Sequence, residues 1–272
     1  NILILSLLAL SFDLCWGYAG IMSFGQALFF GAAGYVVAVL GRDFGFSQLW
    51  GALPLAALVG GIIAALLAAF LLLGRSTPTT VFVALGTLTG AYAAERFVSG
   101  WEYVGAGNGV SSVRLLAAGG YEFAEGIAFY LLALFISLAF YVVARLVVKS
   151  QFGLVLAGVR QNEERLAFLG YRVAVFKALV FSFAGVMAGV SGALYAYHQG
   201  FVGPTNLGPG LSTTAVLYCL FGGAGTLVGS VLGVLLIEIL SYVLGEQPLL
   251  RQYWQVVLGV ILLAVVTFRP SG

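Results

Sequence analysis

The residues able to do chemistry inside the apolar part of this chain are few. Acidic side chains interrupt three apolar segments, as Asp13, as Glu95 beside Arg96, and as Glu238. A charge at the centre of a membrane-spanning helix costs about 2.5–3.5 kcal/mol, so each should face protein or water. Asp13 and Glu238 could relay protons or substrate, or be acids satisfied by hydrogen bonds between helices. Glu95 and Arg96 lie near the end of their segment, where long side chains reach the membrane surface.

A glycine-rich break after the first apolar segment is the candidate for a substrate path. Gly17, Tyr18 and Gly20 stand in this break, and Ser23 and Gln26 follow it closely. An interrupted helix exposes backbone N–H groups, which can bind a carboxylate. The serine and glutamine side chains would add polarity beside them. The alternative is that the glycines only allow helices to pack closely.

The sequence shows no catalytic, cofactor or metal site. Neither Lys149 nor Lys177 follows a glycine, so the phosphate-binding pattern G-x-x-x-x-G-K-[ST] is absent. His198 is the only histidine, which excludes a multi-histidine metal site. We therefore expect a protein that is not an enzyme and holds no cofactor, so any ATP hydrolysis that drives it must occur in a partner.

The composition requires a membrane. The chain has 272 residues, of which 61% are hydrophobic and 8% charged, whereas soluble domains carry about 25% charged residues. The net charge of +2 is too small to suggest nucleic acid. The apolar runs are too long for the strands of a β-barrel. At ~20 residues per span, an all-α polytopic membrane protein with about eight or nine helices is expected.

Apolar segments separated by polar or glycine-rich turns divide the chain. They are expected at residues 1–16, 23–40, 50–73, 79–98, 126–148, 173–197, 211–221, 226–245 and 253–268. Together they form a single transmembrane domain over 1–272. The chain opens in an apolar run without an initiating Met, so we expect sequence to precede it.

Basic residues fix the expected orientation. The positive-inside rule places the loop at 149–171 in the cytoplasm, and alternation then places the C-terminus there too. The loops at 99–125, 198–210 and 245–252 fall outside.

The charged stretch at 145–177 contains six of the twelve Lys and Arg of the chain. Asn162 suits the N-cap of a helix, and Glu163 and Glu164 place negative charge in its first turn. Gly170 suits the residue that ends it. A short helix is therefore predicted from Glu163 to Leu169.

A second short helix is predicted just before it, from Phe152 to Arg160. Its apolar residues recur at helical spacing and form one stripe. Two amphipathic helices at the membrane surface can rest on lipid headgroups. Alternatively, they fit a groove in a partner, with apolar residues as anchors.

Four motifs in order along the chain resemble those of one transporter family. GYAGIMSFGQALFFGAAGY at 17–35 is similar to the pattern G-Y-A-G-x-x-S-x-G-x-A-x-F-x-G-x-G-A-Y, and GAGNGV at 105–110 to a T-G-G-x-x-G loop. GGAGTLVGSVLG at 222–233 is similar to G-G-x-G-T-x-x-G-P-x-x-G. The charged stretch and the helix after it share with the family Ser150, Gly153, Leu156, Arg160, Asn162, Glu163, Gly170, Lys177, Gly189, Gly192, Ala193 and Leu194. The family comprises the permease subunits of branched-chain amino-acid ABC importers (the LivM type).

The resemblance implies a permease that moves branched-chain or other hydrophobic amino acids across the bacterial inner membrane by alternating access. The implied partners are two ATP-binding cassette subunits, a second homologous permease subunit, a periplasmic substrate-binding protein and membrane lipid. The ATPase-coupling residues would lie in the charged loop and its two helices. They are Phe152, Gly153, Arg160, Asn162, Glu163, Glu164, Phe168 and Gly170.

Departures from the family pattern leave the substrate open. Leu154 stands where arginine is frequent, and Gly158 replaces an apolar helix former. RLAFLGY at 165–171 is closer to the urea and short-amide transporters of the same family, so a urea or short-chain amide permease is an alternative. From other classes, a proton-coupled secondary transporter that uses Asp13 or Glu238, or a membrane assembly subunit, also stays open.

Overall fold

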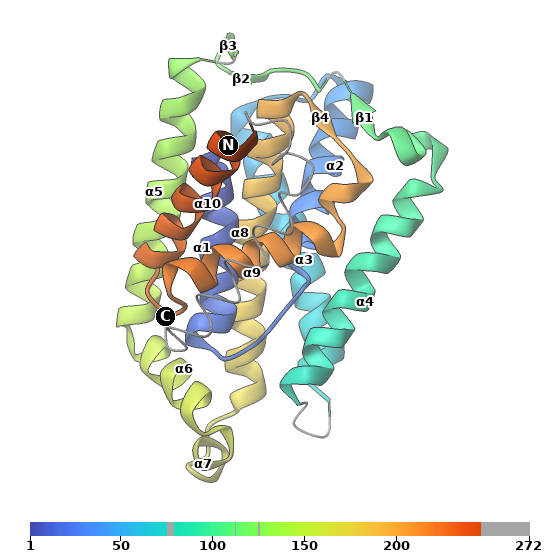
Figure 1. Cartoon of the computed structure of the whole chain (residues 1–272). Helices are drawn as coiled ribbons and strands as arrows, with labels where there is room; N and C mark the ends of the chain where they lie inside the picture. The colour runs from blue at the N-terminus through green and yellow to red at the C-terminus, as the bar shows by residue number, and fades with distance from the viewer. Residues whose placement is uncertain (75–78, 112, 125, 246–272) are drawn as a thin grey trace.

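The computed structural model describes residues 1–74, 79–111, 113–124 and 126–245, and helices dominate them (Figure 1). The helices are α1 Ile2–Asp13, α2 Gln26–Phe44, α3 Leu49–Leu72, α4 Thr80–Ser99, α5 Ile127–Lys149, α6 Gln151–Gln161, α7 Glu163–Phe168, α8 Val173–Gln199, α9 Pro209–Gly222 and α10 Val228–Gly245. The strands are β1 Val110–Ser111, β2 Leu116–Ala118, β3 Tyr121–Phe123 and β4 Phe201–Val202. The predicted all-α polytopic fold is confirmed.

The apolar segments become helices close to their predicted bounds. Among the described residues, α2, α3, α5 and α8 are long and apolar enough to cross a membrane, and α1, α9 and α10 are shorter apolar helices. The predicted last span at 253–268 lies outside the described residues. Each earlier segment overlaps a helix, because uninterrupted apolar sequence satisfies its backbone within a helix.

α8 is the central helix, and α1, α2 and α3 pack around it. Glycines bring these helices together backbone to backbone. A Cβ added to Gly192 would lie 1.9 Å from the carbonyl oxygen of Phe30 on α2. One added to Gly189 would lie 2.5 Å from the carbonyl oxygen of Ala56 on α3. Small residues at such contacts are the usual basis of helix packing in lipid.

Large apolar side chains face outwards from the bundle. Phe70 on α3 is 82% exposed and Phe135 on α5 is 71% exposed, and Leu66 and Leu138 are exposed beside them. In water such a surface would be an aggregation hazard. It suits contact with lipid, as the composition predicts.

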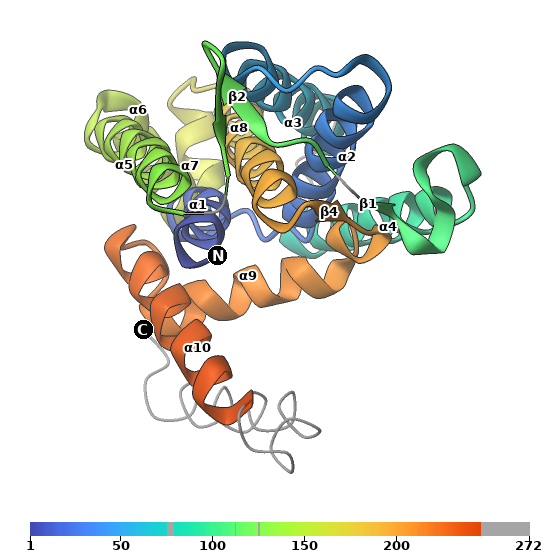
Figure 2. The ribbon, with the colours of Figure 1, turned by 90° about the horizontal axis from the view of Figure 1, so that it is seen from above.

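Two of the loops expected outside, at 99–125 and 198–210, lie together at one end of the bundle, opposite α6 and α7 (Figures 1 and 2). The third, at 245–252, falls almost wholly outside the described residues. β1 and β4, from the loops at 99–125 and 198–210, pair antiparallel with Val110 opposite Val202. β2 and β3 form a hairpin at the same end. These two loops and the charged stretch thus lie at opposite ends of the bundle, and which end faces the cytoplasm stays a prediction.

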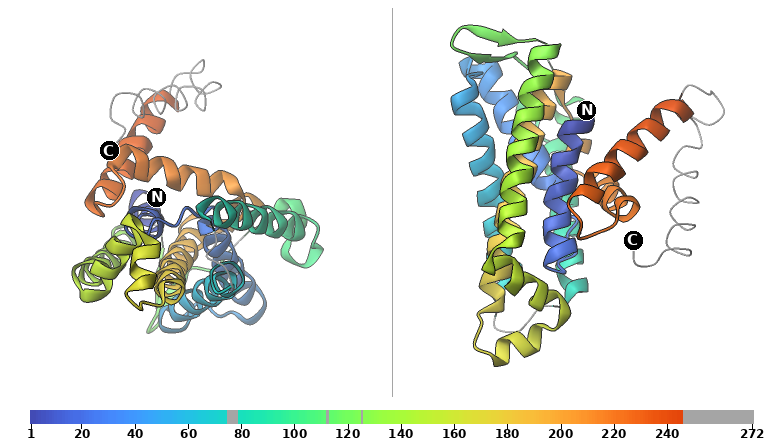
Figure 3. Two further views of the ribbon diagram at one scale, coloured as in Figure 1. Left: turned by 90° about the horizontal axis from the view of Figure 1, so that it is seen from below. Right: turned by 90° about the vertical axis from the view of Figure 1, so that its left-hand side faces the viewer.

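α9 differs from the predicted alternation, which required the run at 211–221 to cross the membrane. The helix has 14 residues, or about 21 Å at 1.5 Å per residue, which is less than the ~30 Å of a hydrocarbon core. It runs across the direction of α5 and α8 rather than along it (Figures 1 and 3). Hydropathy alone does not distinguish a helix that crosses from one that lies transversely.

Candidate functional site

α7 begins and ends where the sequence predicts. The side-chain oxygen of Asn162 accepts a hydrogen bond from the backbone N–H of Arg165 at 2.9 Å. Gly170 has a φ of +89°, and the N–H of Tyr171 donates to the carbonyl oxygen of Leu166 at 3.2 Å. This is a Schellman ending, which glycine favours because it adopts positive φ without strain. The predicted helix is confirmed, one residue shorter than expected.

α6 confirms the other predicted helix of the charged stretch. Leu156 and Val159 are buried, and Arg160 is exposed near its end. Gly153 permits the tight corner between α5 and α6, since an added Cβ would lie 1.9 Å from the carbonyl oxygen of Val148. The stripe of apolar residues therefore packs inwards at this corner.

An apolar surface remains on the outside of α6 and α7. Phe168 is 90% exposed, and Leu154, Leu169 and the acidic Glu164 are also exposed. A surface hollow of about 610 Å³ lies between these helices and the start of α8. Its lining residues are Gln151, Phe152, Leu154, Val155, Leu166, Leu169, Tyr171 and Phe176. Apolar side chains with an acidic neighbour are the elements that a partner groove would recognise.

An ion pair joins α7 to α8. The ammonium of Lys177 lies 2.5 Å from a carboxylate oxygen of Glu163, and the two side chains are 11% and 26% exposed. Because the pair is partly withdrawn from water, it fixes α7 more firmly than a surface pair would. The partner of Glu163 was not predicted. Lys177 belongs to the motif that resembles the transporter family. It lies 14 positions after Glu163, however, and this separation in sequence does not predict a contact.

Arg160 connects the charged stretch to the glycine break. Its guanidinium donates a hydrogen bond to the carbonyl oxygen of Gly17. Its side chain also lies against Gly20, and a Cβ added to Gly225 would be 3.0 Å from Nη1. The structure thus brings together two groups of residues that the sequence presents as separate sites.

The glycine break is a true interruption of a helix. α1 continues as a π-helical turn, Leu14–Tyr18, and the N–H of Ile21 then donates to the carbonyl oxygen of Cys15 at 2.8 Å. Gly20 has a φ of +68°, and α2 starts only at Gln26. π-Helical turns inside helices are frequent at functional sites. Tyr18 is half-buried at the end of this turn.

Asp13 is buried and fully hydrogen-bonded by backbone. One carboxylate oxygen accepts from the N–H of Gly225 at 2.6 Å, and the other from the N–H of Leu227 at 2.9 Å. Of the two interpretations of Asp13, the geometry therefore supports an acid whose hydrogen bonds are all made within the protein. Its partners are the amides of the second glycine-rich turn, which meets the first turn here.

Ser23 and Gln26 point into the protein. The hydroxyl of Ser23 accepts from the N–H of Gly25 at 3.1 Å. The amide of Gln26 donates to the sulfur of Cys15 at 3.6 Å and accepts from the hydroxyl of Ser11 at 3.3 Å. Both side chains are fully buried, so their polar atoms serve contacts within the chain. Their part in a substrate path stays a prediction.

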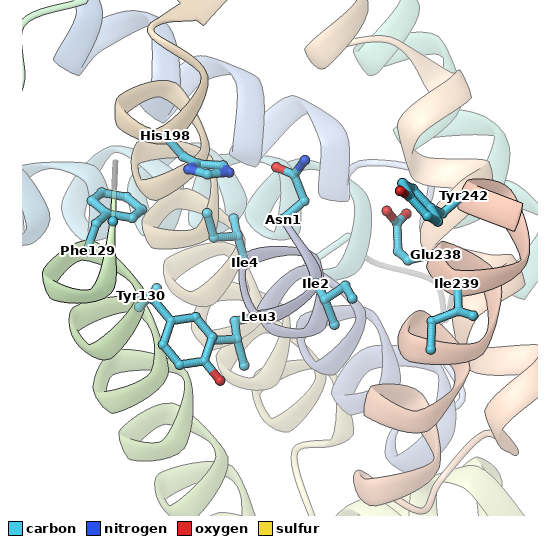
Figure 4. Close-up of a pocket in the computed structure, with 12 residues that line it drawn as sticks. Asn1, Ile2, Leu3, Ile4, Phe129, Tyr130, His198, Glu238, Ile239 and Tyr242 are labelled. Carbon is cyan, nitrogen blue, oxygen red and sulfur yellow. The ribbon is translucent and has the colours of Figure 1, made fainter. Parts of the chain in front are cut away.

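Glu238 lines a cavity of about 480 Å³ between α1, α5, α8 and α10. The hydroxyl of Tyr218 donates to its carboxylate at 2.6 Å. Glu238 and Tyr242 lie on one side of this cavity, across from Asn1 (Figure 4). The cavity wall is mostly apolar, and the acid has a hydrogen-bond partner.

The charges in the last turns of α4 make local contacts. The guanidinium of Arg96 donates to the hydroxyl of Tyr92 at 3.0 Å, and the carboxylate of Glu95 lies against Gly208. The hydroxyl of Tyr103 donates to Asp43, and this hydrogen bond raises the pKa of Tyr103. These contacts hold loops together at the end of the molecule opposite α6.

The described ranges hold no group of three or more His, Cys, Asp and Glu that could bind a metal ion. The functional contacts that sequence reasoning missed are Lys177 with Glu163, and Asp13 with Gly225 and Leu227. The second contact joins residues more than 200 positions apart. The sequence indicates only that an acid inside an apolar segment needs hydrogen-bond donors, and it does not identify them.

The chain is similar to known permeases along most of its length. The family model described as the permease component of the branched-chain amino acid transport system matches residues 1–266. The permease protein LivM of the high-affinity branched-chain amino acid transport system of Salmonella typhimurium is 25% identical, over 98% of this chain and 66% of the relative. The corresponding protein of Escherichia coli is 24% identical over the same shares.

A second group of relatives matches part of the chain. The autoinducer 2 import system permease protein LsrC of Yersinia enterocolitica is 32% identical, over 46% of this chain and 36% of the relative. The chain spans about two thirds of the length of the LivM relatives. No solved structure matches it.

Proposed function

Because the chain belongs to the family of permease components of branched-chain amino acid transport systems, we propose that it is the membrane-spanning permease of an ATP-driven importer. In this role its helices enclose the path for substrate. α6 and α7 receive the movement of an ATPase partner, and the chain opens alternately to either side of the membrane.

The observation that carries this proposal is the construction of the charged end. α7 is capped at both ends and tied to α8 by the pair of Glu163 and Lys177. Phe168 and Leu154 are left exposed on its outer side. α6 is tied by Arg160 to the glycine break of the first helix. A partner that moves these short helices would therefore pull directly on the membrane-spanning part.

The subunits of the proposed complex have different tasks. The chain itself is not an enzyme and holds no cofactor, and ATP is hydrolysed by two ATP-binding cassette subunits. A second homologous permease subunit completes the path, and a periplasmic binding protein delivers substrate. The complex lies in the bacterial inner membrane, with α6, α7 and the C-terminus in the cytoplasm, as the basic charge of this end favours.

The proposed substrate is a branched-chain or other hydrophobic amino acid. The LivM relatives, which align with nearly the whole chain, support this choice. The similarity to LsrC, a permease protein of an autoinducer 2 import system, makes autoinducer 2 a second candidate. A urea or short-amide substrate is a third. Uptake of each labelled compound by cells that express the complex would separate them.

Site-directed cross-linking tests the docking surface. A cysteine replaces Phe168 on α7, and a matched cysteine replaces Tyr121 on β3, which is exposed at the opposite end. In cells with the complete complex, a short cross-linker at Phe168→Cys should capture a protein identified by mass spectrometry as an ATP-binding cassette subunit. Tyr121→Cys should not capture it. Capture from the β3 position alone would overturn the assignment.

A further inference from the structure

α9 and α10 form a hairpin that is packed backbone to backbone. A Cβ added to Gly222 would lie 1.8 Å from the carbonyl oxygen of Gly229, and one added to Gly233 would lie 1.9 Å from that of Tyr218. Such close contacts leave little room for the two helices to slide past each other. The hairpin should therefore move as one body.

This hairpin stands at the side of the bundle (Figure 3). α10 packs mainly against α9 and α1. Near the turn of the hairpin, the attachment to α1 is polar. Asp13 holds the N–H groups of Gly225 and Leu227. The thiol of Cys219 donates to the carbonyl oxygen of Ala9 at 3.3 Å.

The turn that Asp13 holds has an unusual backbone. Gly225 has a φ of +87°, and Leu227, which carries a side chain, has a φ of +39°. A left-handed conformation at a non-glycine residue is strained and persists only where its surroundings impose it. The two hydrogen bonds from the turn to Asp13 are such a constraint.

Arg160 reaches the same point from α6. Gly17 lies between the two charged side chains, since its carbonyl oxygen accepts from Arg160 and an added Cβ would be 2.2 Å from Asp13 Oδ1. The same Cβ would be 2.4 Å from the backbone nitrogen of Gly225. The end of α6, the π-helical turn and the turn of the hairpin are thus in direct contact.

We propose that Asp13 is a positioning residue through which movement of α6 is passed to the α9–α10 hairpin. The path runs from Arg160 to the carbonyl of Gly17, and from Asp13 one turn away to the amides of Gly225 and Leu227. Asp13 is then neither a proton relay nor a substrate ligand. This role rests on the proposed function, because α6 is displaced only if an ATPase partner engages it.

Spin-label distances test the role in the complete complex. Labels are placed at Phe135→Cys on α5 and Leu235→Cys on α10, both exposed, while the native Cys15 and Cys219 are buried and remain unlabelled. The distance between the labels should differ between the ATP-free and ATP-bound complex. Asp13→Asn and Arg160→Met should each abolish this difference.

Uptake measured per ATP hydrolysed is the second readout. Asp13→Asn and Arg160→Met should each lower uptake per ATP about tenfold, a size usual for coupling between sites, with the ATPase subunits still bound.

The double variant should lower uptake per ATP no further than either single variant, because the effects of residues that act in series are not additive. Arg160→Lys, which keeps a donor for the Gly17 carbonyl, should retain part of the coupling. A loss of stability alone would lower complex yield without changing uptake per ATP.

Asp43→Asn is the matched control, because it removes an exposed carboxylate in the last turn of α2 whose partners are Arg42 and Tyr103. It should leave both readouts unchanged. The role of Asp13 is overturned if the unaltered complex shows no change in distance, or if Asp13→Asn keeps both the change and the uptake per ATP. The proposed function fails separately, if the unaltered chain binds no ATPase subunits or takes up substrate without ATP.

Discussion

At the scale of single residues, the polar side chains of the charged end satisfy backbone groups where helices are interrupted. Asn162 accepts from an N–H at the start of α7, Arg160 donates to a carbonyl of the π-helical turn, and Asp13 accepts from two amides of the hairpin turn. In hydrocarbon, each unsatisfied backbone group costs several kcal/mol. These side chains therefore stabilise the interruptions, most of all where the backbone is buried, as at Asp13.

Asn162→Ala should loosen α7. Loss of an N-cap costs about 1 kcal/mol of helix stability. α7 has only six residues, so this loss should affect the whole helix. Hydrogen exchange of the α7 amides should become about fivefold faster, since each 1.4 kcal/mol corresponds to a factor of ten. Gln161→Ala, one residue earlier and exposed, is the control and should leave the rates unchanged. Equal rates in Asn162→Ala and the unaltered chain would show that the cap is dispensable.

Glu163→Lys should uncouple ATP hydrolysis from transport. The change places two ammonium groups where the pair with Lys177 stands, and it reverses the favourable charge at the first turn of α7. Loss of a hydrogen bond between charged groups costs about 1.5–3 kcal/mol, enough to displace α7 from α8. Membrane insertion, followed by the amount of protein in the membrane fraction, should stay normal while uptake falls. Glu164→Lys, which changes charge in the same turn without this ion pair, should be milder.

The local features of these residues could be predicted from the sequence, and the distant ones could not. Asn162 and Gly170 act on amides and carbonyls within a few positions of themselves, so capping rules locate them. Asp13 and Gly225 meet only after the intervening helices have folded. Sequence reasoning correctly requires donors for a buried acid, but it gives no way of choosing among the amides of distant turns.

At the scale of elements, glycine decides how close the helices lie. α8 presents Gly185, Gly189 and Gly192 to α3 and α2, and the corresponding added Cβ atoms would all be within 2.5 Å of a neighbouring atom. For the glycines of the break after the first apolar segment, close packing of helices was the alternative prediction. The structure shows such packing at these three glycines of α8, whereas Gly17 and Gly20 shape a break in the first helix.

Gly189→Ala should destabilise the bundle. The added methyl group would meet the backbone of Ala56 on α3, and overpacking of this kind costs typically 1–3 kcal/mol. The temperature of unfolding in detergent, followed by tryptophan fluorescence, should fall by several degrees. Gly210→Ala on α9 is the control, because nothing lies within 4 Å of the added Cβ. A melting temperature equal to that of the control would contradict the packing account.

Element boundaries were predictable, but the direction of an element was not. The spans up to residue 245 match helices because long apolar runs and glycine or proline turns carry that information. α9 has the same composition as a span, yet it lies across the bundle. Gly222 and Gly233 pack it closely against α10, and such tertiary contacts cannot be predicted from its composition.

At the scale of the whole molecule, the two ends have different construction. One end consists of short strands and loops, in which strands pair through their backbones, as Val110 does with Val202. The other holds α6 and α7, with exposed apolar side chains and a direct connection to the first helix. An apolar bundle between them presents large side chains outwards. The asymmetry fits a permease that receives substrate at one end and force at the other.

Transport by purified protein in sealed vesicles tests this account most directly. The chain is reconstituted with the proposed second permease and ATPase subunits, and a labelled branched-chain amino acid is supplied with the proposed binding protein. Uptake is then measured with ATP or with a proton gradient. The account predicts uptake that requires ATP and the ATPase subunits, is lost in Glu163→Lys, and does not respond to the proton gradient. Uptake driven by the proton gradient in the absence of ATP and of ATPase subunits would contradict it.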